Sequence, residues 1–238
     1  MIQNILRAID VENTYIKNKI NGEKKFELLD EIKRSGFESL EEYYKEKKSY
    51  LFKQLNFAVV NRKPSECIEQ GWRLLNEKVA AIFFVDTPDV TVYSYNSKPY
   101  NKEYCQKNNI TVYELPAGGG TIVSNKGDLA FGLCVPDNLE IDNYFILDNI
   151  SDILRKYMDN VEIIDNDILV DGGKVCGITY LRHNDMILFL AHFSFSDNSK
   201  LIDSICHKDT KPIKTPSYIR EIDKNTLKTE VVKWLQSI

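Results

Sequence analysis

The stretch NDILVDGGKVCG, residues 166 to 177, places one lysine directly after a Gly-Gly turn. Lys174 then begins a short apolar run that is typical of a strand. A lysine at the start of a strand is most often a solvated edge residue. Held beside a bound ligand, its ammonium group could instead polarise a carbonyl or bind a phosphate as a point charge. Strict alternation predicts Lys174 and Cys176 on one face of this strand, with Gly177 and Thr179 on the other.

A run of three glycines, Gly118, Gly119 and Gly120, lies in the stretch ELPAGGGTIVS, residues 114 to 124. Consecutive glycines cost conformational entropy, so the bare backbone must serve a turn or a close approach to a ligand. The run is not a P-loop, because neither Gly-Lys-Ser/Thr nor a helix follows it. It is not a dinucleotide fingerprint either, because the next element is a strand. A ligand-binding loop and a wide β-bulge both stay open as interpretations.

Short strands and amphipathic helices must position these two loops. Strands are predicted over residues 56–61, 80–86, 89–96, 110–115, 121–124, 129–135, 161–165, 167–171, 174–181 and 186–195. Helices are predicted over residues 65–78, 100–109, 143–158 and 225–238, the first capped by Ser65. Strands and helices interleave, and hairpins occur among the strands. The pattern therefore predicts an α+β fold with a mixed or antiparallel sheet flanked by helices.

Residues 1–54 differ in composition from the rest of the chain. They contain no proline and are rich in Glu, Lys, Leu and Tyr. Apolar residues at helical spacing, such as Leu28, Leu29 and Ile32, predict two or three helices. We expect a helical N-terminal extension over residues 1–54, packed on a main domain over residues 55–238. Docking of a partner protein is the alternative role for the extension.

Composition excludes several classes of protein. The 238 residues carry 31 basic and 35 acidic side chains, a net charge of -4, and we find no basic stripe with interleaved aromatic residues, so no nucleic-acid partner is expected. No apolar run approaches the length of a membrane span, and the N-terminus lacks a signal-peptide pattern. Five scattered cysteines without a CxxC pair favour reduced thiols in the cytoplasm. The three histidines do not cluster at metal-ligand spacing, so no structural zinc site is expected.

The order of the two loops resembles the lipoate-protein ligase A family of the biotin/lipoate protein ligase superfamily. The resemblance runs from about residue 55 to the C-terminus. The glycine triplet and the following KGDLAF match the family's glycine loop. Asn166-Asp167 match its Asn-Asp before a strand, and Lys174 with Gly177 match its lysine-x-x-glycine. The segment TPSYIREI looks like the family's closing segment before the final helix.

This resemblance implies the biotin/lipoate protein ligase fold and a two-step reaction. Lipoate or octanoate would attack ATP to give an acyl-adenylate. A lysine of an acceptor lipoyl domain, or of a glycine-cleavage-H-like protein, would then take the acyl group. Lys174 would be catalytic, in contact with the acyl carbonyl and a nucleotide phosphate, and Asp167 would bind Mg²⁺. The remaining contacts to substrate and nucleotide would come from Gly118, Gly119, Gly120, Thr121, Asn166, Asp167, Gly177 and Thr179.

Two alternatives stand beside this ATP-dependent ligase. Ahead of the glycines the family usually carries one or two arginines where this chain has Glu114 and Leu115, so Lys174 and magnesium remain as the positive charge and weak ATP binding is expected. An ATP-independent acyltransferase would take octanoyl or lipoyl groups from a thioester carrier, with Cys176 or Cys134 as a relay. Both cysteines are also typical of small buried hydrophobic residues. The second alternative is an inactive protein of this fold that binds a protein or a small acid.

Overall fold

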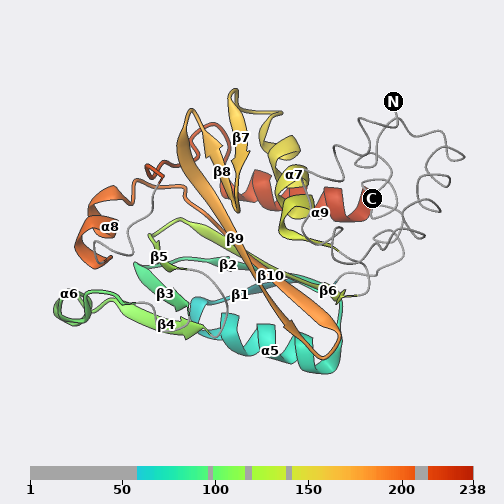
Figure 1. Cartoon of the computed structure of the whole chain (residues 1–238), viewed down its shortest axis with the longest axis horizontal. Helices are drawn as coiled ribbons and strands as arrows, with labels where there is room; N and C mark the ends of the chain where they lie inside the picture. Colours follow the sequence, from blue (N-terminus) through green and yellow to red (C-terminus); the bar gives the residue numbers. More distant parts are fainter. Residues whose placement is uncertain (1–57, 96–98, 116–119, 138–140, 207–213, 238) are drawn as a thin grey trace, which may run out of the picture. The chain divides into compact units, whose positions relative to one another are not determined.

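A computed structural model describes residues 58–95, 99–115, 120–137, 141–206 and 214–237 of the chain (Figure 1). The helices predicted over residues 1–54 lie outside these ranges, as do Gly118 and Gly119. Within the described part of the chain, none of the helices has the length and hydropathy that crossing a membrane requires.

The described residues form strands, α-helices and one 3-10 turn. The strands are β1 (Ala58–Arg62), β2 (Ala81–Asp86), β3 (Thr91–Tyr95), β4 (Thr111–Leu115), β5 (Thr121–Ser124), β6 (Leu129–Pro136), β7 (Val161–Ile164), β8 (Asp167–Val170), β9 (Gly173–His183) and β10 (Met186–Phe193). The α-helices are α5 (Cys67–Glu77), α6 (Lys102–Lys107), α7 (Asn143–Leu154), α8 (Ser199–Ile205) and α9 (Lys224–Ser237). The 3-10 turn is η1 (Pro64–Glu66).

Two sheets organise these elements (Figure 1). The larger sheet has the strand order β1-β2-β6-β10-β9-β8-β7, and the smaller has the order β4-β3-β5. The pairs β1/β2 and β3/β4 are parallel, whereas the other strand pairs are antiparallel. The prediction of an α+β fold with a mixed sheet flanked by helices is confirmed.

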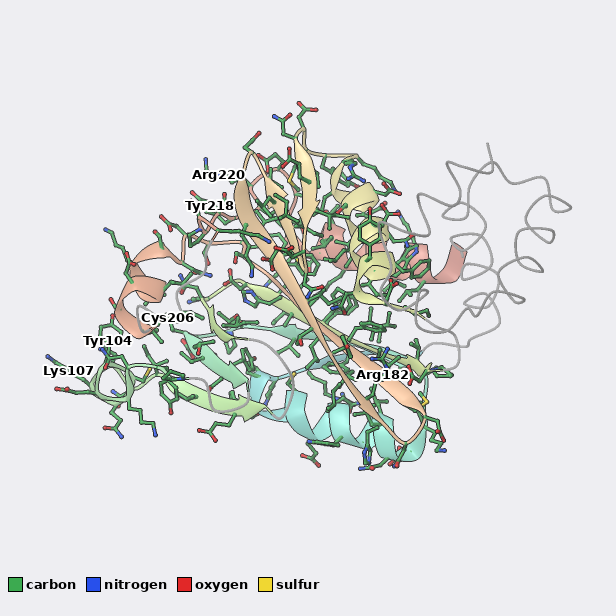
Figure 2. The ribbon with its side chains drawn as sticks, viewed as in Figure 1. Tyr104, Lys107, Arg182, Cys206, Tyr218 and Arg220 are labelled. Carbon is green, nitrogen blue, oxygen red and sulfur yellow. The ribbon has the colours of Figure 1, made fainter. Side chains whose placement is uncertain are left out.

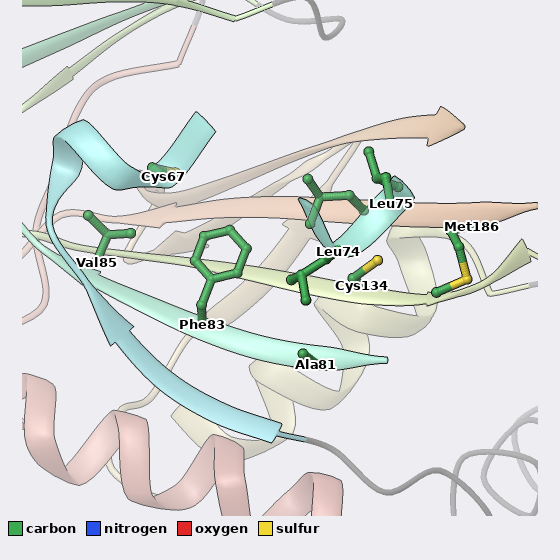
Figure 3. Close-up of a cluster of buried hydrophobic side chains, with 9 residues drawn as sticks. Cys67, Leu74, Leu75, Ala81, Phe83, Val85, Cys134 and Met186 are labelled. Carbon is green, nitrogen blue, oxygen red and sulfur yellow. The ribbon is translucent and has the colours of Figure 1, made fainter. Parts of the chain in front are cut away.

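Helix α5 covers one face of the larger sheet. Its Leu74 and Leu75 pack against Phe83 of β2, Cys134 of β6 and Leu188 of β10 (Figure 3). These five side chains are at most 3% exposed. Burial of large apolar side chains contributes about 1.5 to 3 kcal/mol each. This cluster therefore holds β2, β6 and β10 together. Strand β10 and its neighbour β9 line the cleft described below.

Helices α7 and α9 belong to the opposite face of the sheet. Successive side chains of a strand point to opposite faces, so Phe84 points away from the side of Phe83. The ammonium group of Lys228, on α9, lies 5.8 Å from the centre of the Phe84 ring and forms an ion pair with Asp86. The rings of Phe145 on α7 and Trp234 on α9 are 6.4 Å apart. Helices thus cover both faces of the central strands.

The smaller sheet packs against α6 and α8 through a separate apolar cluster. Val92 and Val123 of the sheet contact Cys105 of α6 and Ile205 of α8. Figure 2 shows Tyr104 and Cys206 close together at this end of the molecule, and both belong to the same cluster. A second contact joins the two sheets, because Tyr93 and Ile122 pack with Leu181 and Leu190 from β9 and β10. Strand β5 is thereby held beside β9, the strand that carries Lys174.

The structure differs from the prediction at the start of α5 and in an additional helix, α8. The turn η1 precedes α5, so the helix begins at Cys67 and Ser65 lies in the 3-10 turn instead of capping the helix. Helix α8 was not predicted, because SKLIDSI is only seven residues long and shows too few apolar positions to reveal helical periodicity.

Candidate functional site

A cleft of about 670 Å³ lies between β5 and the strands β8, β9 and β10. Side chains from α7, α8 and the segment after residue 213 complete its wall. The predicted site residues that line it are Gly120, Thr121, Asn166, Asp167, Lys174, Gly177 and Thr179. The fold therefore brings all the described members of the predicted set to one place, although they come from β5, β8 and β9 and from the residues just before β5 and β8.

A β-bulge determines where Lys174 points. Ile168 of β8 pairs with Cys176 and Leu169 pairs with Lys174, so Val175 is an extra residue in β9. A β-carbon built on Gly177 would lie 3.0 Å from the Nζ atom of Lys174. Lys174 and Gly177 therefore share the cleft face. The alternation predicted opposite faces for them and was wrong, because one inserted residue reverses the facing of every position before it.

Glycine is needed at each of the two positions before Lys174, for a different physical reason. Gly172 has a φ of +75°, in the left-handed region where a glycine is favoured for the turn. At Gly173 a β-carbon would lie 2.4 Å from the β-carbon of Ser217, so only glycine lets that segment approach. Two hydrogen bonds form across the gap: Lys174 N donates to Thr215 O and Ser217 N donates to Lys174 O, both at 2.8 Å. Both backbone polar groups of Lys174 are therefore held by the segment Thr215–Ser217.

Asp167 is held between two lysine side chains. Its Oδ1 lies 2.7 Å from Lys174 Nζ, and its Oδ2 lies 3.0 Å from Lys214 Nζ. Both oxygens are thus occupied by ammonium groups, which would repel a dication at the same carboxylate. Among the described residues, no three His, Cys, Asp or Glu side chains gather in a way that could hold a metal ion. These residues do not fit a protein-bound Mg²⁺, and the geometry favours an ion-pair role for Asp167.

Lys214 was missed by the sequence analysis. It precedes the TPSYIREI segment by one position and reaches the cleft only because that segment pairs with Lys174, a long-range contact without a local sequence signal. Burial alone would lower the pKa of Lys214. Its hydrogen bonds to Asp167 and Asp165 outweigh burial and hold the pKa above its ordinary value.

A buried polar network lies behind the cleft. His192 Nε2 is 2.9 Å from Ser124 Oγ and 3.5 Å from Oδ2 of Asp128, a fully buried carboxylate. Asp128 also accepts hydrogen bonds from Asn198 Nδ2 and from the Phe195 amide, each at 2.8 Å. Burial by itself would raise the pKa of Asp128, but its hydrogen-bonding partners, led by His192, hold it below the ordinary value. This network fixes β5 against β10 and the segment that leads into α8.

The cleft also has an apolar part and polar atoms without partners. Its apolar lining includes Ile122 and Val123 from β5, Leu190 from β10 and Ile202 from α8. Thr121, which also lines the cleft, has a buried Oγ1 with no hydrogen-bond partner among the described residues. A slot of this kind suits an apolar chain that carries a polar head group.

The two candidate relay cysteines are buried and protonated. Cys134 and Cys176 are at most 1% exposed. Burial raises the pKa of the Cys134 thiol to about 12 and that of Cys176 far above its ordinary value. Since the thiolate is the nucleophile, neither side chain has the environment of a reactive cysteine.

Residues 70–229 match the family model described as the lipoyl protein ligase A/B catalytic domain. By direct sequence comparison, no curated protein matches the chain. Several solved structures share its fold. One is Plasmodium falciparum LipL1 in complex with lipoate, with a TM-score of 0.67 and 14% identity over 76% of this chain. The match spans 62% of that protein's length.

Two further structures extend this likeness. A bipartite lipoate protein ligase from Thermoplasma acidophilum, described together with its E2 lipoyl domain, has a TM-score of 0.62 and 13% identity over 77% of this chain and 84% of its own. A lipoate-protein ligase A bound with ATP has a TM-score of 0.60 and 13% identity over 77% of this chain and 85% of its own. At these identities the likeness establishes the fold.

Proposed function

Because the chain belongs to the lipoyl protein ligase A/B catalytic-domain family, we propose that it activates lipoate or octanoate with ATP and transfers the acyl group to a lysine of an acceptor lipoyl domain. A glycine-cleavage-H-like protein is the other acceptor class in this proposal. The observation that carries it is the position of Lys174. Its backbone is held by hydrogen bonds to Thr215 and Ser217, and its ammonium group faces a cleft with an apolar part.

In the proposed first step, a carboxylate oxygen of the acid attacks the α-phosphorus of ATP. The acyl-adenylate forms and pyrophosphate leaves. Negative charge gathers between carboxylate and phosphate during this step, and a preorganised cation at that point lowers the barrier. Lys174 is the residue in this role. Gly120 and Thr121 line the wall across from it, where backbone amide groups can approach the same junction.

In the proposed second step, the neutral amine of the acceptor lysine attacks the acyl carbon. An amide bond forms, AMP leaves with the bonding electrons, and the amine loses a proton. Lys174 polarises the carbonyl in this step. Asn166 and Thr179 line the same cleft and are the proposed polar contacts to substrate or nucleotide. The apolar acyl chain would lie along Ile122, Leu190 and Ile202.

The test is a coupled assay for pyrophosphate release with ATP and lipoate, octanoate or biotin, followed by mass spectrometry of a lipoyl domain. Lipoate or octanoate should release pyrophosphate and add one acyl group to the acceptor. Acyl transfer from an octanoyl thioester without ATP would instead support the acyltransferase. No reaction with either donor would favour an inactive binding protein of this fold.

A further inference from the structure

Lys214 uses all of its hydrogen-bond donors inside the protein. Its Nζ donates to the carbonyl of Ile164 at 2.5 Å, to Asp165 Oδ2 at 3.1 Å and to Asp167 Oδ2 at 3.0 Å. An ammonium group has three donors. Lys214 therefore has no donor left for a ligand, and it can act on the cleft only through its charge and through the groups that it holds.

The group that links Lys214 to the cleft is the Asp167 carboxylate. Lys214 occupies Oδ2 and Lys174 occupies Oδ1 of the same group. The side chains of Lys214 and Asp167 are 17% and 18% exposed, whereas that of Lys174 is 33% exposed. The cluster is thus ordered from the interior outward, with Lys174 as the member that a ligand meets first.

The positive charge of this cluster depends on Lys214. Lys174 and Lys214 face the carboxylates of Asp165 and Asp167. The Asp165 side chain is 81% exposed, so solvent screens much of its charge. Without Lys214, the Asp167 carboxylate would be paired with Lys174 alone, and the net positive charge at the mouth of the cleft would be lost. An anionic ligand would then meet a neutral ion pair instead of a net positive charge.

We infer that Lys214 is a positioning residue for Lys174, because it neutralises and orients Asp167 and so keeps the Lys174 charge available to an anion in the cleft. The effect of Lys214 on the charge at Lys174 concerns the protein without substrate. The effect of Lys214 on turnover rests on the proposed function.

The first test measures Lys174 without any substrate. Acetylation by an N-hydroxysuccinimide ester at pH 9 needs the free amine, and peptide mass spectrometry reports the rate at each lysine. In Lys214→Met, Asp167 keeps Lys174 as its one described cationic partner and holds that ammonium group more tightly, so labelling of Lys174 should slow by at least about threefold. The exposed Lys78 is the internal reference for the labelling rate. The matched control variant is Asp165→Asn, because it removes a carboxylate of the same cluster that solvent already screens. An unchanged or faster rate at Lys174 in Lys214→Met overturns the inference.

The second test uses pyrophosphate release from the full chain. A wild-type protein that releases none contradicts the proposed function, while the labelling test still decides the inference. In an active protein, Lys214→Met should raise KM for the acid and ATP by roughly tenfold, and Lys214→Arg should restore it. In an Asp167→Asn background, Lys214→Met should cause no further loss, because Lys214 acts through that carboxylate. Additive losses would overturn the inference.

Discussion

Lys174 and Gly177 face the same cleft, and the lysine Nζ lies 3.0 Å from the point that a β-carbon on Gly177 would occupy. The bulge at Val175 produces this relationship, because it places the lysine side chain over the glycine. The Asp167 Oδ1 atom is also 3.0 Å from that point. The spacing lysine-x-x-glycine therefore has a physical meaning: the glycine leaves the space in which the ion pair lies.

Lys174→Ala should reduce acyl transfer by at least about a hundredfold, the usual loss when a preorganised charge at the reacting centre is removed. Thermal unfolding should change little, because the sheet does not need this charge. Steady-state pyrophosphate release and a melting curve measure the two effects. Full activity in this variant would remove Lys174 from the mechanism.

Gly177→Ala should reduce turnover roughly ten- to a hundredfold while the protein still folds. The added methyl group would meet only the ends of flexible side chains, which can move but then leave their positions. Gly173→Ala is the matched comparison, because its methyl group would meet Ser217 at 2.4 Å and should cost about 2 kcal/mol of stability. Wild-type kinetics in Gly177→Ala would contradict this interpretation of the spacing.

Cys176→Ala should keep acyl transfer within about twofold of wild type and lower the free energy of unfolding by about 1 kcal/mol. The thiol is buried and its raised pKa keeps it protonated, so its contribution is packing. Cys134→Ala should behave in the same way. Loss of transfer from a thioester donor in either variant, with folding intact, would restore the relay hypothesis.

Asp128→Asn should lower the free energy of unfolding at pH 7 by about 2 kcal/mol, because charge-assisted hydrogen bonds to a buried group are weakened. The pKa of Asp128 in the folded protein lies below its ordinary value. Its stabilisation is therefore complete above about pH 4 and is lost as the pH falls through the lower folded value. Urea unfolding at several pH values should show the two proteins converging in acid. A constant difference would mean that the carboxylate charge is not involved.

Deletion of residues 1–54 should leave a protein that still folds, because those residues differ in composition from the remainder and the family match begins at residue 70. Far-ultraviolet circular dichroism and cooperative thermal unfolding of residues 55–238 measure this. Recovery of only insoluble or non-cooperative material would show that the extension completes the core.

Local sequence patterns predicted the strands and the longer helices, because apolar periodicity extends over enough residues to be distinctive. The facing of Lys174 was not predictable, since a bulge is a property of the pairing between β8 and β9 and leaves no sign within β9 alone. Lys214 illustrates a second limit. Its position follows from the pairing of Pro216 with Lys174, a contact between segments that are remote in the chain.

The sequence was a sound guide to properties that depend on neighbouring residues, and it failed for contacts between segments that are distant in the chain. A buried thiol could be anticipated at Cys176 from its apolar neighbours. The network of Ser124, Asp128 and His192 could not, because each side chain is ordinary in its own segment and gains its partners only when β5 and β10 meet.

The pairing of Lys174 with the segment Thr215–Ser217 also sets an order of events during synthesis. Strand β9 emerges from the ribosome long before its partner segment, which follows β10 and α8. Until that segment arrives, Lys174 lacks the backbone hydrogen bonds that fix it, and Asp167 lacks its second lysine. A nascent chain can therefore build most of the sheet before the surroundings of Lys174 are complete, and they are completed only after Ser217 has been synthesised.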